Sequence, residues 1–190
     1  MTTQLNEEIL TDKLTLLSKE YLGANGLQAL NIYSMKVTPV CDIENPRARE
    51  HFYKTDSAFC GRHNSLPEAK KIKNVHLVPV LCEHGSHDEY LSELGFRLCS
   101  ESASYLLGMM SKVHPNDLPK DLLGTNLVAY DKANFKNLKS NDPCYMVIQQ
   151  KYITDRNKHK RNLLLLPNDT LSSLPADKYL WVLAEDVSAN

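Results

Sequence analysis

The sequence has no long apolar run and no recognisable export signal. No stretch approaches the roughly 20 consecutive apolar residues that a membrane-spanning helix requires. Residues 1–8 lack the basic region and the apolar region that together make a secretory signal peptide. These two absences predict a soluble, cytoplasmic protein.

Glycine is scarce, and this scarcity argues against several enzyme classes. The seven glycines are scattered, and none belongs to a G-x-G-x-x-G, G-x-x-x-x-G-K-[ST] or G-x-S-x-G motif. The first two motifs bring backbone N–H groups to a phosphate, and the third places a serine nucleophile on a sharp turn. We therefore expect neither these nucleotide-binding loops nor this type of serine hydrolase.

The sequence also has no excess of acidic or of basic residues. The 22 basic and 23 acidic residues give a formal net charge of −1. Such a balance produces no strong field around the molecule, so non-specific attraction to nucleic acid or to an anionic membrane is not expected.

Cysteine is present, but not in a pattern that indicates disulfides. Five cysteines, an odd number, are widely spaced over 190 residues. A chain of this length buries a normal core without disulfides, and its apolar fraction of 42% is ordinary. We expect reduced thiols in an intracellular protein, and a single domain over residues 1–190.

The N-terminal third predicts a helix, a strand and a long irregular segment. Apolar residues recur at helical spacing over 6–22, and Gly23 and Gly26 provide a stop. Residues 29–40 suit a strand. Residues 41–74 are polar, contain two prolines and show no sustained period, which is typical of a functional or mobile segment.

The remainder predicts a strand, two helices and four further strands. The apolar run 75–82 suits a strand, and helices follow at 86–95, where Ser86 and Glu89 have capping-box spacing, and at 100–113. Strands are predicted at 126–131, 144–154, 162–167 and 179–185. Because regular βαβ alternation is absent, we predict an α+β fold. It consists of a mostly antiparallel sheet packed against an N-terminal helix and a central helix pair.

Two short Cys/His groups are candidate ligands for a zinc ion. Each group closes a tight chelate loop, as in small zinc sites, and together they comprise Cys60, His63, Cys82, His84 and His87. A structural zinc would also hold the irregular 41–74 segment. The favoured interpretation is two unrelated Cys/His pairs, so no cofactor is expected, and zinc is the alternative. Cys82 and Cys99 are also weighed as thiol nucleophiles, although both suit a core position better.

A basic turn between two of the predicted strands is a candidate nucleic-acid contact. Its cationic residues are Arg156, Lys158, Lys160 and Arg161, and Lys70, Lys71 and Lys73 form a second group. Basic residues that meet on one face can contact phosphates. The favoured interpretation is a solvated hairpin tip that discourages strand-edge aggregation, and nucleic-acid binding is the less favoured one.

No complete catalytic constellation stands out in the sequence. The favoured function is therefore that of a small intracellular binding or regulatory protein, without catalysis, that acts through a protein partner. The alternative is a zinc-binding protein, or a metal- or thiol-dependent enzyme, that uses residues 60–63 and 82–87. The oligomeric state is not predicted.

Overall fold

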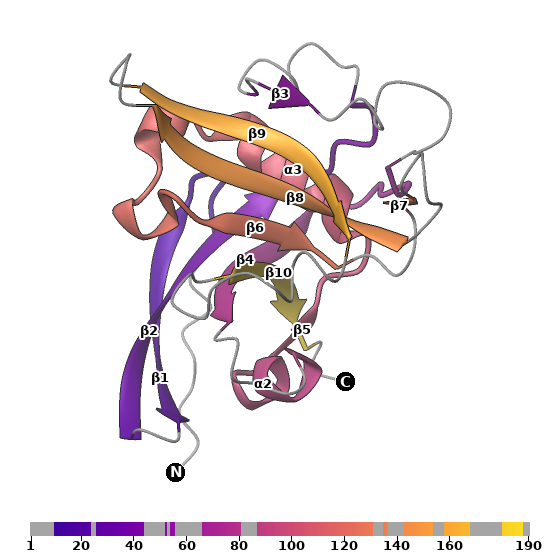
Figure 1. Ribbon diagram of the computed structural model, residues 1–190. Coiled ribbons are helices and arrows are strands. Elements are labelled where there is room, and N and C mark those ends of the chain that lie inside the picture. Colours follow the sequence, from indigo (N-terminus) through magenta and orange to yellow (C-terminus); the bar gives the residue numbers. More distant parts are fainter. Residues whose placement is uncertain are drawn as a thin grey trace.

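The computed structural model describes residues 10–23, 26–43, 52, 54–55, 66–80, 87–130, 135–136, 143–153, 158–167 and 180–187. Within these ranges, ten strands form one mixed sheet that packs with two α-helices and two 3-10 helices (Figure 1). The helices are α2 (His87–Glu93), α3 (Ser102–Lys112), η2 (Pro115–Asp117) and η3 (Lys120–Leu122). The strands are β1 (Thr15–Gly23), β2 (Gly26–Val37), β3 (Lys54–Thr55), β4 (Lys73–Val80), β5 (Phe96–Leu98), β6 (Asn126–Ala129), β7 (Phe135–Lys136), β8 (Pro143–Ile153), β9 (Lys158–Pro167) and β10 (Leu180–Asp186).

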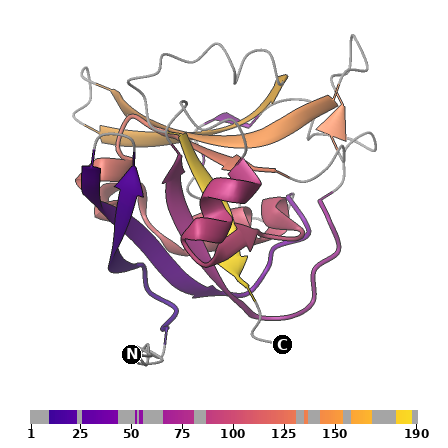
Figure 2. The same ribbon diagram turned by 90° about the horizontal axis from the view of Figure 1, so that it is seen from below.

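The strand order of the sheet brings together segments that are far apart in the sequence, and β10, the last described strand, lies near its centre. The order is β1-β2-β4-β10-β6-β8-β9-β3, with β5 beside β10 and β7 beside β8. Neighbouring strands are antiparallel, except that β10 runs parallel to β6 and β3 runs parallel to β9. In Figure 2, β10 is the yellow strand through the middle of the molecule.

The two α-helices cover opposite faces of this sheet. Successive side chains of a strand point to opposite faces. Val75 and Leu77 of β4 join the apolar cluster around α3, whereas Val78 and Val80 join the cluster around α2. Each helix therefore has its own core, with the sheet between them.

The predicted α+β fold, a mostly antiparallel sheet with an N-terminal helix and a helix pair, is wrong. The structure is mostly β with a mixed sheet, and α2 and α3 do not form a pair because they lie on opposite faces. Residues 15–23 form a strand whose odd-numbered residues are half-buried and whose even-numbered residues are exposed. Leu17 and Tyr21 are four residues apart, a spacing that fits one helical turn and equally fits two strand repeats. The glycines interpreted as a helix stop instead end β1 and begin β2, where Gly26 has a φ of 100° that favours glycine.

The helix predicted at 100–113 is confirmed as α3, although its N-terminus differs. Glu101 occupies the N-cap position in the left-handed conformation, with φ 54°, so the helix itself begins at Ser102, two residues after the predicted start. The helix predicted at 86–95 is present as the shorter α2. Neither these helices nor any other described one is long and apolar enough to cross a membrane.

Arg161 lies inside the protein, although the sequence places it among the polar residues of a turn. It is the cross-strand partner of Gln150 and shares a face of β9 with the buried Leu163 and Leu165. Its guanidinium donates to the carbonyl oxygens of Met110 and Val113, at the end of α3, and to Gln150 Oε1. Burial lowers the pKa of Arg161 to about 10, so the group stays charged at neutral pH. The cation thus satisfies helix carbonyls that have no partner within the helix.

Replacing Arg161 with alanine should lower the free energy of unfolding by about 3 kcal/mol, because buried carbonyls lose a charged donor. Urea denaturation followed by circular dichroism measures this loss. Lys160→Ala is the matched control, since Lys160 neighbours it in β9 but is only half-buried. The control should cost about 1 kcal/mol or less. An Arg161→Ala protein as stable as the parent would contradict the role given to this side chain.

Candidate functional site

The predicted zinc ligands fall largely outside the described residues, namely Cys60, His63, Cys82 and His84. His87 is the first residue of α2, and its ring lies 5.1 Å from the ring of Tyr130. Within the described ranges, no group of three or more His, Cys, Asp or Glu side chains could hold a metal ion. The zinc site therefore stays a prediction.

The predicted basic residues have different environments. Arg156 lies outside the described ranges, Lys158 begins β9, and Lys160 is half-buried. Arg161 is the buried residue that binds the end of α3. Its guanidinium is therefore not offered to a phosphate at the surface.

Cys99, the thiol candidate that the structure describes, is a core residue. It is buried, and its Sγ lies 3.3 Å from the carbonyl oxygen of Ser100, to which it donates. A thiol sealed in this way is poorly placed to attack a substrate.

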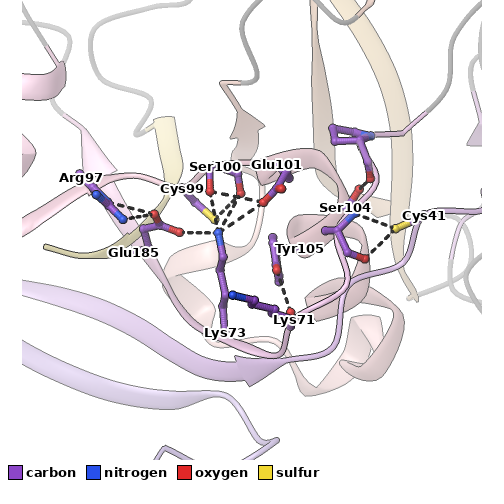
Figure 3. Close-up of polar contacts among 12 residues, drawn as sticks. Cys41, Lys71, Lys73, Arg97, Cys99, Ser100, Glu101, Ser104, Tyr105 and Glu185 are labelled. Carbon is purple, nitrogen blue, oxygen red and sulfur yellow. Dashed lines mark hydrogen bonds and ion pairs between the residues drawn. The ribbon is translucent and has the colours of Figure 1, made fainter. Parts of the chain in front are cut away.

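A cluster of ion pairs joins β4, β5, β10 and the start of α3 (Figure 3). Lys73 Nζ lies 2.9 Å from Glu185 Oε2, 2.6 Å from Ser100 Oγ and 3.4 Å from Glu101 Oε2. Arg97 approaches the other oxygen of Glu185 through Nε and Nη2, each at 2.9 Å. Glu185 is the centre of the cluster, because its side chain is only 9% exposed and accepts from both cations.

Lys73 acts in this cluster as a donor. Burial alone would lower its pKa, but the hydrogen bond to Glu185 and the nearby acidic groups outweigh burial, so its pKa is raised. A protonated Lys73 donates to the Ser100 hydroxyl and cannot remove its proton. The Lys73–Ser100 contact therefore differs from an activated serine, which needs a neutral base.

Two hollows flank the cluster, and their charges balance. The first, of about 500 Å³, is lined by Glu68, Lys70, Lys71, Lys73, Ser100, Glu101 and Tyr105. The second, of about 300 Å³, is lined by Lys73, Asn74, Arg97, Ser100, Glu185 and Asp186. Counting shared residues once, four basic side chains face four acidic ones. The first hollow has three basic and two acidic side chains, and the second has two of each, so neither has a large excess of charge. This near balance favours a structural role for the cluster.

Glu185→Gln should lower the free energy of unfolding by about 2 kcal/mol, because two cations lose their shared, nearly buried carboxylate. Glu101→Gln is the matched control, since Glu101 also contacts Lys73 but its side chain is 40% exposed. It should cost about 0.5 kcal/mol or less, as exposed pairs do. Equal losses in the two variants, measured by urea denaturation, would contradict the central position of Glu185.

A second polar group lies on the other face of the sheet, where Ser34, His76 and Asp186 form a chain. Ser34 Oγ lies 2.7 Å from His76 Nδ1, and His76 Nε2 lies 3.2 Å from Asp186 Oδ1. The residue types are those of a serine-hydrolase triad, but Ser34 has no exposed surface and cannot meet a substrate. Phe96 covers the imidazole at 4.6 Å between ring centroids.

His76 should make stability depend on pH. Burial lowers its pKa, more than the charge of Asp186 raises it, and Lys19 adds to the lowering. The folded pKa is therefore below the unfolded value of about 6.5. The unfolded chain takes up the proton first on acidification, so stability is complete above about pH 6.5 and falls below it.

The expected loss is at most about 1.4 kcal/mol per pH unit. His76→Gln should remove this part of the pH dependence of urea unfolding, whereas His114→Gln, at an exposed histidine, should keep it. A parent and a His76→Gln protein with the same dependence between about pH 5 and 7 would refute this assignment.

The hairpin of β1 and β2 extends beyond the rest of the sheet and has one uncovered face (Figure 1). On its covered face, Leu17, Tyr21, Leu30 and Ile32 pack in the cluster around α2. We call the opposite side the open face, formed by Leu16, Ser18, Glu20, Leu22, Leu27, Ala29 and Asn31. At the inner end of this face η3 contacts it, where Asp121 accepts a hydrogen bond from Asn31.

The open face carries large exposed apolar side chains. Leu16 is 53%, Leu22 is 75% and Leu27 is 65% exposed, and they are three of the six large apolar residues so exposed in the described part of the chain. Leu22 and Leu27 are cross-strand partners near the turn. Grouped exposed apolar residues are typical of interaction surfaces, whereas single ones are ordinary.

A cavity of about 340 Å³ lies at the inner end of the open face. It is lined by Ala29, Leu30, Asn31, Pro79, Asp121 and Trp181. Asp121 comes from η3, and Trp181 is the cross-strand partner of Pro79 in the middle of the sheet. Asp121 Oδ2 accepts from Asn31 Nδ2 at 2.7 Å and from the Tyr33 hydroxyl at 2.9 Å.

The comparisons with family models, curated proteins and solved structures found no match to this chain. Function must therefore be argued from the sites themselves.

Neither the open face nor its cavity is among the residues that the sequence singles out. One signal was available, because Gly23 and Gly26 stand between Leu22 and Leu27, a pattern typical of a hairpin connection. The cavity had no local signal, since Asn31, Asp121 and Trp181 come together only through the fold.

Proposed function

We propose that this protein is a small, non-catalytic binding protein of the cytoplasm that acts through a protein partner, and that the open face is where the partner docks. The observation that carries the proposal is the exposure of Leu16, Leu22 and Leu27 on one uncovered face. Burying one such side chain against a partner contributes about 2 kcal/mol.

The charges of this surface indicate the chemistry of the partner. Glu20 on β1 and Asp121 beside Asn31 are its charged side chains, and both are acidic. β1 also ends the order of described strands, so an extended chain can lie along it. The partner that fits is an extended segment with a basic residue among apolar ones.

Three polar groups support binding over catalysis. Lys73 is held protonated between carboxylates, Ser34 is sealed beside His76, and Cys99 is buried. None of these groups combines access to substrate with an activated nucleophile.

The test is selection from a displayed library of short random peptides against the full chain, followed by titration calorimetry. The selected peptides should combine a basic residue with apolar ones. The Leu22→Ser/Leu27→Ser variant should bind them at least about tenfold more weakly, since each leucine is worth about 2 kcal/mol when buried.

Ile72→Ser is the matched control, because Ile72 is also exposed, at 58%, but lies outside the hairpin. It should bind as the parent does. The proposal is wrong if no peptide is selected, or if the peptides bind the double variant as tightly as the parent.

A further inference from the structure

We infer that the cavity at the inner end of the open face receives a basic side chain, lysine or arginine, of the docking segment. Asp121 would meet the cation, and the ring of Trp181 would pack against its alkyl chain. This inference rests on the proposed function and specifies which residue of the partner gives the contact its selectivity.

The cavity suits a long side chain with a charged end. The antiparallel register that pairs Tyr33 with Leu77 brings Asn31 opposite Pro79, and Pro79 pairs with Trp181. Asn31, Pro79 and Trp181 therefore lie in one row across β2, β4 and β10. Pro79 and the ring of Trp181 give an apolar floor for an alkyl chain, and Asp121 is the one charged residue among the lining residues. A basic side chain buries its methylene groups in such a site and keeps its charged end at the carboxylate.

Asp121 is held in a fixed orientation. Its Oδ2 accepts two hydrogen bonds, from Asn31 and Tyr33, and no hydrogen bond to Oδ1 is found among the described residues. Burial, together with the bond to Asp121, raises the pKa of Tyr33 to about 12, so the hydroxyl remains a donor at neutral pH. One carboxylate oxygen is thus occupied, and the other is available to an incoming cation.

Trp181 contributes its ring to the cavity and not its indole N–H. The residue is 3% exposed and its Nε1 has almost no accessible surface, so a ligand in the cavity cannot reach this donor. The ligand therefore meets the indole as an apolar surface.

The open face beside the cavity distinguishes a peptide from a free organic cation. The carboxylate of Asp121 accepts either one, but the exposed leucines of the open face add contacts only to the apolar residues that flank a basic residue in a peptide.

Trp181 is the only tryptophan of the chain, so the tryptophan fluorescence comes from a residue that lines this cavity. The full chain is titrated with acetyl-Val-Arg-Val-amide, with the same peptide containing neutral citrulline for arginine, and with agmatine, which has the guanidinium but no flanking residues. The arginine peptide should change the emission and saturate, and should bind at least about tenfold more tightly than the citrulline peptide. Agmatine should bind more weakly than the arginine peptide.

Asp121→Asn should reduce the affinity for the arginine peptide to that for the citrulline peptide. Asp117→Asn, an exposed aspartate of η2, is the matched control and should bind as the parent does. The comparison of arginine with citrulline uses the unaltered protein, so it does not depend on how a variant folds.

The outcomes separate this inference from the proposed function. Equal affinity for arginine and citrulline, or an unchanged emission, would overturn the inference even if selected peptides bind the open face through Leu22 and Leu27. Tighter binding of agmatine than of the peptide would also overturn it, in favour of a free organic cation. If peptides bind the Leu22→Ser/Leu27→Ser variant and the Asp121→Asn variant as tightly as they bind the parent, the proposed function is overturned as well.

Discussion

The structure depends on the insertion of β10 between β4 and β6. In the described sheet, β10 is the only link between β1-β2-β4 on one side and β6-β8-β9-β3 on the other. The last described strand therefore joins two groups of strands that precede it in the chain, an arrangement that requires the closure of long loops. The same strand supplies Trp181 to the cavity, Glu185 to the ion pairs and Asp186 to His76. Core, charge cluster and candidate site thus share one element.

The candidate docking surface follows from an unequal covering of the two faces. α3 covers the face of β2 that includes Met35 and Val37, but not its outer part, where Leu27 and Ala29 are exposed. α2 covers the opposite face of the hairpin as far as Tyr21 and Leu30. The hairpin is therefore supported from one side and exposed on the other. A surface built in this way is held in place by the core and is still accessible to a partner.

Much of the local structure could be predicted from the sequence. The strands predicted at 75–82, 126–131, 144–154 and 179–185 correspond to β4, β6, β8 and β10, and the helix at 100–113 corresponds to α3. These segments have apolar residues that fit one period clearly. The first element failed because Leu17 and Tyr21 fit both periods, and because helix and hairpin both end well at a glycine. Residues 15–23 form a strand because Leu17 and Tyr21 then pack in the apolar cluster around α2.

The arrangement of the strands and the candidate site could not be predicted in the same way. The parallel pairing of β10 with β6 joins segments more than 50 residues apart, and local patterns do not encode it. Arg161 could not be placed from the sequence for the same reason. A basic residue near a turn is expected to be exposed to solvent, and its burial follows only from its contacts with the end of α3. Asn31, Asp121 and Trp181 likewise become a site only when β2, η3 and β10 meet.

The most direct test of the central claim is amide NMR of the full chain titrated with a peptide selected against it. Docking on the open face predicts that the shifted signals cluster in β1 and β2, extend to Asp121 and Trp181, and leave β8 and β9 unchanged. Shifts centred on β8 and β9, or on the Lys73 cluster, would contradict the claim and would place the binding surface elsewhere on the sheet.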